Sequence, residues 1–121
     1  PIYNPTTKVT FSCCREPIFF SELQELEVQS LILTGMEAHV CYMQTAIDLL
    51  NRDYRVYVAN DATCSRRKSD WQTALDLMRQ AGAVVSSTES LVFQILERAD
   101  SETFRSMLPL IKAMPDMDKK S

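Results

Sequence analysis

The sequence predicts an α/β protein in which parallel strands alternate with helices. Short apolar or β-branched runs at residues 31–33, 55–59 and 83–85 are each followed by a segment with helical hydrophobic spacing. The connections suit only crossover units, which place successive strands parallel in one sheet and put helices on its faces. We therefore expect a three-layer α/β/α arrangement.

The composition indicates one ordinary globular domain spanning residues 1–121. Hydrophobic residues make up 45% and charged residues 24% of the chain, which excludes a disordered or fibrous protein. The formal net charge of −3 argues against nucleic-acid and anionic-membrane partners, because both favour basic surfaces. No segment has the length of a transmembrane helix and the N-terminus lacks the features of a signal peptide, so we expect a cytoplasmic protein.

The cysteines and the single histidine limit the metal and redox chemistry. Cys13, Cys14, Cys41 and Cys64 show no Cys-x-x-Cys spacing, and we expect them to stay reduced in a chain without a secretory signal. His39 has no second histidine to pair with as a zinc ligand. We therefore expect no metal and no cofactor.

The first thirty residues predict one short helix after an irregular start. Residues 1–7 are rich in proline, asparagine and threonine, so they should be irregular. Residues 8–13 alternate in polarity and fit a brief strand or an extended loop. Residues 21–24 (Ser-Glu-Leu-Gln) match a capping box, which predicts a helix that buries Leu23 and Leu26 and ends before Ser30.

The next segment predicts a strand that feeds a helix. Residues 30–34 contain a continuous apolar core of the kind that is buried on both faces in a parallel sheet. Residues 38–52 then carry apolar side chains at three- and four-residue intervals, which is typical of an amphipathic helix. The predicted buried face of this helix consists of Met43, Ala46, Ile47 and Leu50.

A second strand and helix follow. Residues 55–59 predict a strand, and the polar residues 60–68 predict a loop. A second capping box at residues 69–72 opens a helix that Gly82 is well placed to end. The core stripe of this helix is predicted to be Trp71, Ala74, Leu75 and Met78.

The last part of the chain predicts a third strand and two helices. Residues 83–85 form the strand, and residues 86–89 cap a helix whose buried face would be Leu91, Val92, Ile95 and Leu96. A final helical pattern is strained by Pro109 and consists of Phe104, Met107, Leu108 and Ile111. Residues 113–121 are expected to fray.

The carboxyl ends of the strands narrow the search for a functional site. Ligands in parallel α/β sheets lie beyond these ends, here residues 35–41, 60–64 and 86–89. In the first of them a helical pattern begins with Cys41 near its start. The partial positive charge of a helix N-terminus favours thiolate over thiol, so Cys41 is a candidate nucleophile. A buried, inert cysteine is the alternative.

Residues 34–41 read Thr-Gly-Met-Glu-Ala-His-Val-Cys, and this region through residue 50 resembles the nucleophile region of isochorismatase-like cysteine hydrolases. The likeness continues in order through Val-Ala-Asn-Asp-Ala-Thr-Cys-Ser-Arg at residues 58–66, residues 74–82 and Ser-Thr-Glu-Ser at residues 87–90. It runs from Lys8 to about Lys112 and most resembles the isochorismatase domain-containing proteins. The resemblance implies a Rossmann-type, isochorismatase-like fold.

The resemblance also implies a mechanism. In this family a Cys, Lys and Asp triad attacks an amide or related bond through a covalent thioester. Cys41 falls on the nucleophile and Lys8 on the triad lysine, whose ammonium would stabilise a thiolate. By resemblance the peptide bond between Met36 and Glu37 would be cis, and the backbone amides of Glu37 and Cys41 would form the oxyanion hole.

By resemblance the triad aspartate ends an N-terminal strand that would lie beside residues 31–34, and the chain starts after it. We therefore expect an N-terminally truncated version of the fold, which is either a fragment or a chain whose apolar sheet edge another chain covers. Asp61 is a possible substitute base, although an aspartate at a strand end more often caps a loop. Glu37 is a similar candidate.

Other polar residues have simpler interpretations. His39 lies two positions before Cys41, so their side chains diverge on a helix, which favours a partly exposed turn histidine over a Cys-His dyad. Residues 66–68 (Arg-Arg-Lys) fit a solvated loop better than a site for a substrate anion or an acidic partner. Cys13 and Cys14 are interpreted as packing residues.

Two functions of different classes remain open. The first is a hydrolase that acts on a small amide-like or vinyl-ether-like substrate, with Cys41 as nucleophile and Lys8 as its electrostatic partner. The second is a catalytically silent relative that serves as an interaction or assembly module through its sheet edge. We expect a homo-oligomer. An acidic side chain within hydrogen-bond reach of Cys41 would favour the first.

Overall fold

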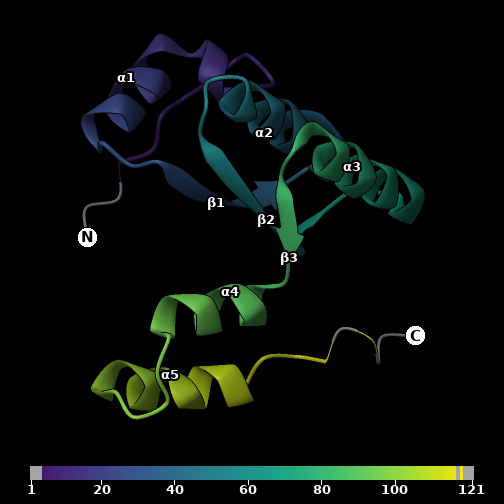
Figure 1. Ribbon diagram of the computed structural model, residues 1–121. Helices are drawn as coiled ribbons and strands as arrows, with labels where there is room; N and C mark the ends of the chain where they lie inside the picture. Colours follow the sequence, from purple (N-terminus) through teal and green to yellow (C-terminus); the bar gives the residue numbers. More distant parts are fainter. Residues whose placement is uncertain (1–3, 117, 119–121) are drawn as a thin grey trace.

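A parallel sheet lies between two helical layers in the computed structural model, which describes residues 4–116 and 118 (Figure 1). The strands β1 (Ser30–Met36), β2 (Arg55–Cys64) and β3 (Val84–Ser86) pair in that order. One face carries α1 (Pro17–Glu25), α2 (Met43–Leu50) and α3 (Lys68–Ala81), and the other α4 (Thr88–Leu96) and α5 (Glu102–Lys112). The predicted α/β class and parallel sheet are confirmed.

The main core lies between the sheet and the layer formed by α1, α2 and α3. Val56 and Val58 of β2 pack here with Leu49 of α2 and Met78 of α3, and all four side chains are fully buried. Burying an aliphatic side chain of this size contributes roughly 1.5–3 kcal/mol. This packing fixes the direction of α2, and therefore the position of the turn that leads into it from β1.

The buried face of α2 differs from the prediction. Ala46 is buried as expected, but the other fully buried positions are Thr45 and Leu49, while Met43 and Leu50 are only partly buried. A π-helical turn, η2 (Ala38–Tyr42), precedes α2. Its wider turn rotates the following residues relative to an uninterrupted α-helix, so the inward face shifts.

Two of the three predicted capping boxes do not begin a helix. α1 starts at Pro17, because proline at the first helical position has a φ angle suited to the helix, so Ser21 lies inside the helix. Leu23 is buried as predicted, whereas Leu26 is exposed. α3 starts at Lys68, one residue before Ser69.

The third cap is confirmed at the start of α4. The Ser87 hydroxyl accepts a hydrogen bond from the Ser90 N–H at 3.2 Å. Of the face predicted to be buried, Leu91 is buried but Ile95 is exposed. The predicted end of α3 is also confirmed, since Gly82 adopts a left-handed conformation with φ of 112° that favours glycine.

The last helix contains Pro109, as the sequence predicts. Its predicted stripe is only partly buried: Phe104, Met107, Leu108 and Ile111. Residues 8–12 form a loop with bends at residues 9–12 instead of a strand, and a short 3-10 turn, η1 (Cys13–Arg15), follows them. Residues 1–3, 117 and 119–121 of the predicted irregular start and frayed tail lie outside the described residues.

β1 is an edge strand, so it is not buried on both faces as the sequence suggested. In the described part of the chain it pairs with β2 alone, and Ile32 and Met36 are 44% and 69% exposed. β2 continues through the polar stretch that was predicted to be a loop. Its register with β1 shifts, because Leu33 pairs with Val58 but Gly35 pairs with Thr63.

Candidate active site

Cys41 lies in the turn that connects β1 to α2. The Met36–Glu37 peptide bond at the end of β1 is cis, and η2 begins at the next residue. The Glu37 carbonyl oxygen accepts hydrogen bonds from the N–H groups of Val40 at 3.1 Å and Tyr42 at 3.3 Å. These bonds close the wide turn in which Cys41 is partly exposed.

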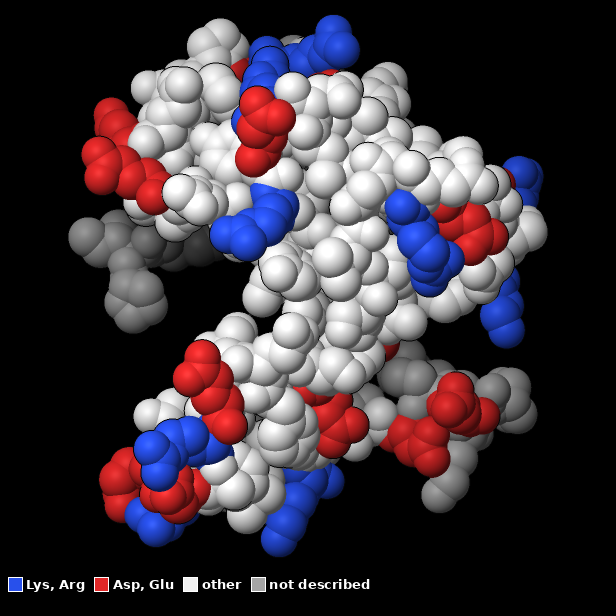
Figure 2. All heavy atoms as spheres, viewed as in Figure 1, with Lys and Arg blue, Asp and Glu red and all other residues white. Residues whose placement is uncertain are grey.

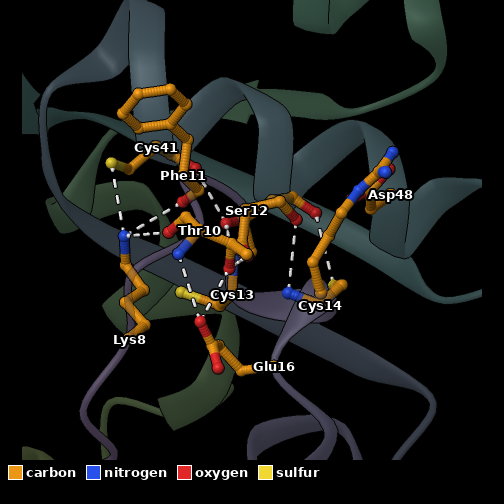
Figure 3. Close-up of polar contacts among 11 residues, drawn as sticks. Lys8, Thr10, Phe11, Ser12, Cys13, Cys14, Glu16, Cys41 and Asp48 are labelled. Carbon is orange, nitrogen blue, oxygen red and sulfur yellow. Dashed lines mark hydrogen bonds and ion pairs between the residues drawn. The ribbon is translucent and has the colours of Figure 1, made fainter.

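Lys8 reaches this thiol from the N-terminal loop. Its Nζ lies 3.4 Å from Cys41 Sγ and also donates to the carbonyl oxygens of Thr10 at 2.9 Å and Phe11 at 3.1 Å (Figure 3). Three acceptors match the three protons of an ammonium group. The structure therefore brings together the two residues that the sequence singled out.

A threonine that the sequence did not single out links the loop to the turn. The Thr45 hydroxyl donates to the Cys41 carbonyl oxygen at 2.7 Å and accepts from the Cys13 N–H at 3.0 Å. Thr45 lies four residues after Cys41, and this spacing places both residues on one face of a helix. That spacing was the available signal for its role.

His39 points away from the thiol. Its Nδ1 lies 2.8 Å from Ser65 Oγ, and its Nε2 lies 3.9 Å from Asp70 Oδ2. The side chain is partly exposed and belongs to η2. The expected partly exposed turn histidine is therefore found, and its ring partners are on the β2 and α3 side of the molecule.

The two candidate substitute bases bind other partners. Asp61 Oδ1 accepts from the N–H of Thr88 at 2.8 Å and from its hydroxyl at 2.7 Å. Glu37 Oε1 accepts from the N–H of Arg66 at 3.1 Å and from its Nε at 3.2 Å. Within residues 4–116 and 118, no carboxylate hydrogen-bonds to Cys41. The Arg66 side chain is ion-paired with Glu37 and is still 86% exposed, in agreement with the expected solvated loop.

The other three cysteines occupy different environments. Cys14 is buried in the core, and this burial raises the pKa of its thiol. Cys13 is partly buried, and Cys64 at the end of β2 is exposed. The packing interpretation therefore holds best for Cys14.

A cavity of about 890 Å³ opens at the carboxyl ends of β2 and β3. Its wall includes Thr63, Cys64, Trp71 and Ser87, and the Thr63 hydroxyl is buried without a hydrogen-bond partner among the described residues. Cys41 is not part of this wall. The paired thiol and ammonium of Cys41 and Lys8 therefore lie outside the wall of this cavity.

Other features of the described residues bear on cofactors and surfaces. In the described part of the chain, no three His, Cys, Asp or Glu side chains cluster closely enough to hold a metal ion. Among the described helices, none has both the length and the apolar character needed to span a bilayer. Figure 2 shows one face of the molecule, on which acidic and basic side chains lie in small mixed groups.

Comparisons with known proteins all point to one family. The Isochorismatase domain model matches residues 4–90. Isochorismatase family protein 1B of Dictyostelium discoideum is 35% identical over 104 residues, which are 86% of this chain and 50% of that protein. Isochorismatase domain-containing protein 2A of Mus musculus is 38% identical over 115 residues, 93% of this chain and 55% of that protein. The chain spans about half the length of these curated relatives.

Solved structures show the same fold. A protein described as MAR1 ribonuclease from Caenorhabditis elegans has a TM-score of 0.81 at 36% identity and is matched over 94% of this chain and 58% of its own. The YcaC gene product of Escherichia coli, described as an octameric hydrolase of unknown specificity, has a TM-score of 0.80 at 18% identity, over 88% of this chain and 55% of its own. The second likeness shows the fold alone.

Proposed function

The chain belongs to the isochorismatase family, and from this premise we propose that it carries the nucleophilic part of a hydrolase site for a small amide-like substrate. The observation that carries the proposal is the 3.4 Å contact between Lys8 Nζ and Cys41 Sγ in the turn after β1. An ammonium at this distance and the start of a helix both stabilise a thiolate.

In the proposed reaction Cys41 Sγ bonds to the substrate carbonyl carbon, and the carbonyl oxygen takes the negative charge. The backbone amides of Glu37 and Cys41 would hold this oxyanion. When the intermediate collapses, the C–N bond breaks, the amine leaves with a proton and a thioester remains. Water then attacks the thioester, which releases the carboxylic acid and restores the thiol.

The amine needs a proton donor, and we propose that this acid comes from polypeptide other than the residues described. No carboxylate among residues 4–116 and 118 hydrogen-bonds to Cys41, and the chain spans only about half of its relatives. The exposed apolar side chains of Ile32 and Met36 on β1 are a suitable place for such a segment to dock.

The same strand edge supports a second proposal, that the chain acts as an assembly module or forms a homo-oligomer. The relevant observation is that β1 pairs on one side only within the described residues. The octameric description of the YcaC gene product is consistent with assembly in this fold. Light scattering of the purified chain tests the homo-oligomer, since a monomer at all concentrations would contradict self-association. As part of the first proposal, that of a hydrolase site, we also propose a cytoplasmic location, because that compartment would keep Cys41 reduced.

A p-nitrophenyl ester tests the nucleophile without the missing acid, because nitrophenolate leaves as an anion and needs no proton. We expect a burst of nitrophenolate and an acyl adduct on Cys41 in the mass spectrum. Cys41→Ser should abolish the adduct, whereas Cys64→Ser, which removes an exposed thiol from the neighbouring strand, should not. Acylation of Cys64 with Cys41 unmodified would contradict the proposal.

Amide hydrolysis tests the missing acid. The chain alone should turn over small amides poorly, and adding the N-terminal half of a relative should raise the rate by about 10²- to 10⁴-fold, the usual contribution of general acid–base catalysis. Fast, Cys41-dependent amide hydrolysis by the 121-residue chain alone would show that the acid lies within it.

A further inference from the structure

The loop that carries Lys8 is held by polar contacts, because its apolar side chains are exposed. Val9 is 93% and Phe11 61% exposed, so neither anchors the loop through hydrophobic burial. Lys8 Nζ donates to carbonyl oxygens of its own loop, those of Thr10 and Phe11. The place of the ammonium therefore follows from the backbone path of residues 8–11.

One carboxylate oxygen fixes this path. Glu16 Oε1 accepts hydrogen bonds from the N–H group of Val9 at 2.9 Å and from that of Thr10 at 3.1 Å (Figure 3). The Thr10 hydroxyl lies 3.0 Å from the same oxygen and 2.8 Å from the Ser12 carbonyl oxygen, so its one proton is shared between them. These are the peptide groups directly after Lys8.

The backbone of Glu16 is itself held by hydrogen bonds to the neighbouring turn and helix. Glu16 is the residue before α1, where its carbonyl oxygen accepts from the Phe20 N–H at 3.1 Å and its N–H donates to the Cys13 carbonyl oxygen at 3.1 Å. Cys14, two residues earlier, is buried in the core. Glu16 thus joins an anchored turn to a loop that has no apolar anchor of its own.

We propose that Glu16 is a positioning residue. By accepting hydrogen bonds from the Val9 and Thr10 N–H groups, it holds the Lys8 ammonium against the Cys41 thiol. The inference rests on the proposed function of the Lys8–Cys41 pair. Hydrogen bonds from Val9 and then Thr10 hold the pKa of the Glu16 carboxyl below its usual range, so the group is a carboxylate at neutral pH. Its oxygen is occupied by these donors, and Glu16 acts through Lys8.

Acylation rates of Cys41 in a double-mutant cycle test the proposal. Lys8→Met should lower the rate near neutral pH by roughly 3- to 10-fold, because the positive charge that lies 3.4 Å from the attacking sulfur is lost. Glu16→Ala should lose a comparable factor, but no more than about 1.5-fold in the Lys8→Met background.

Two further variants give the controls. Glu16→Gln retains an acceptor oxygen and should recover part of the rate, whereas a loss equal to that of Glu16→Ala would overturn the hydrogen-bonding role. Glu25→Ala at the exposed end of α1 should leave the rate unchanged. Alkylation of the buried Cys14 thiol is the control for an intact fold and should stay slow in every variant. If Glu16→Ala accelerates this alkylation, the Cys41 acylation rate of Glu16→Gln decides whether the hydrogen-bonding role of Glu16 holds.

The outcomes separate the two proposals. Equal losses from Glu16→Ala with and without Lys8 would overturn the positioning role alone, because Glu16 would then act by a route that does not pass through Lys8. The positioning role would also be overturned if Lys8→Met clearly lowered the Cys41 acylation rate and Glu16→Ala left it unchanged. A rate insensitive to Lys8→Met would instead refute the proposed Lys8–Cys41 pair, and the positioning role with it.

Discussion

The carboxyl ends of β1 and β2 are neighbours in the sheet, and each is followed or ended by a cysteine, but the two thiols have different surroundings. Met36 pairs with Cys64, so the two ends share one edge. Cys64 is the more exposed thiol, and no hydrogen bond or ion pair to its side chain is present among the described residues. Cys41 has an ammonium at 3.4 Å. Exposure alone is therefore a poorer guide to the reactivity of a thiol than a neighbouring positive charge.

The carboxylates at this edge, unlike the Cys41 thiol, bind groups that join elements of the fold. Asp61 in β2 is bound to Thr88 at the start of α4, and Glu37 after β1 is bound to Arg66 after β2. These groups join elements of the fold and are occupied. Under the proposed function the β1 end carries the chemistry and the β2 end has a structural role, and four experiments can break or sharpen that division.

Ionisation of Tyr42, in the turn after β1, should give the largest change in the free energy of unfolding. Tyr42 is buried, its hydroxyl donates to the Leu33 carbonyl oxygen at 2.6 Å, and burial raises the pKa of Tyr42 to about 12 against a smaller opposing effect of the Ala59 backbone. The unfolded phenol ionises near its ordinary pKa of 10.0. The unfolded state therefore loses its proton first, and the free energy of unfolding should fall by roughly 2–3 kcal/mol as the pH rises through this window.

Urea unfolding at a series of alkaline pH values measures this effect. Tyr42→Phe has no phenol to ionise, so its stability should lack this part of the pH dependence, although it loses the hydrogen bond to Leu33. Parallel stability curves for the two proteins above about pH 10 would show that Tyr42 ionises equally well in the folded state.

Removing Lys8 should erase most of the difference between the two thiols. In the wild type, iodoacetamide should label Cys41 faster than Cys13, Cys14 or Cys64. In Lys8→Met the Cys41 rate should fall roughly 3- to 10-fold, up to about 1.4 kcal/mol, while the Cys64 rate stays unchanged. Lys68→Met at the start of α3 is the matched control, since Lys68 has no contact with Cys41. Faster labelling of any other cysteine in the wild type would show that the site is misassigned.

Asp61 should affect stability and leave the thiol unchanged. Asp61→Ala removes the acceptor for the Thr88 N–H and hydroxyl at the start of α4, which should cost about 1 kcal/mol. Asp61→Asn keeps an acceptor oxygen and should recover most of the loss. Acylation of Cys41 should be the same in all three proteins; a slower rate in Asp61→Asn would instead support Asp61 as the base.

The sequence predicted the order of strands and helices because hydrophobic spacing is local. The apolar run at residues 31–33 marks a strand, and the stripe that includes Ala74 and Met78 marks the buried face of a helix. Helix starts were less predictable: Pro17 begins α1 four residues before the capping box at Ser21, because the fixed φ angle of proline suits a first helical position. The extension of β2 to Cys64 depends on pairing with β1, which residues 60–64 do not encode by themselves.

The site was predictable only in part. The Lys8–Cys41 contact joins residues 33 positions apart, so no local pattern encodes it, and only the family resemblance indicated it. Thr45 and Glu16 were not singled out. Their signals were present: Thr45 lies one helical turn after Cys41, and Glu16 directly precedes a proline that starts a helix. Neither spacing says which distant loop or backbone group the side chain binds.

The link between the two strand ends should give the smallest effect. The Arg66 side chain is 86% exposed, so its ion pair with Glu37 is worth little in water. In Arg66→Ala the backbone N–H of residue 66 can still donate to Glu37, and the free energy of unfolding should change by no more than about 0.5 kcal/mol. Glu37→Ala removes the acceptor of both bonds and should cost about 1 kcal/mol.

The division between the two ends depends on what Arg66→Ala does to the thiol. Arg66 holds Glu37, which directly precedes the turn that contains Cys41, so this pair, like the Ser65–His39 contact, connects the β2 end to that turn through side chains. Because the Glu37 carbonyl oxygen binds Val40 and Tyr42 independently of its side chain, the turn should persist and Cys41 acylation should be unchanged. A rate as low as that of Lys8→Met would mean that the β2 end takes part in holding the nucleophile, and the assignment of that end to structure alone would be wrong.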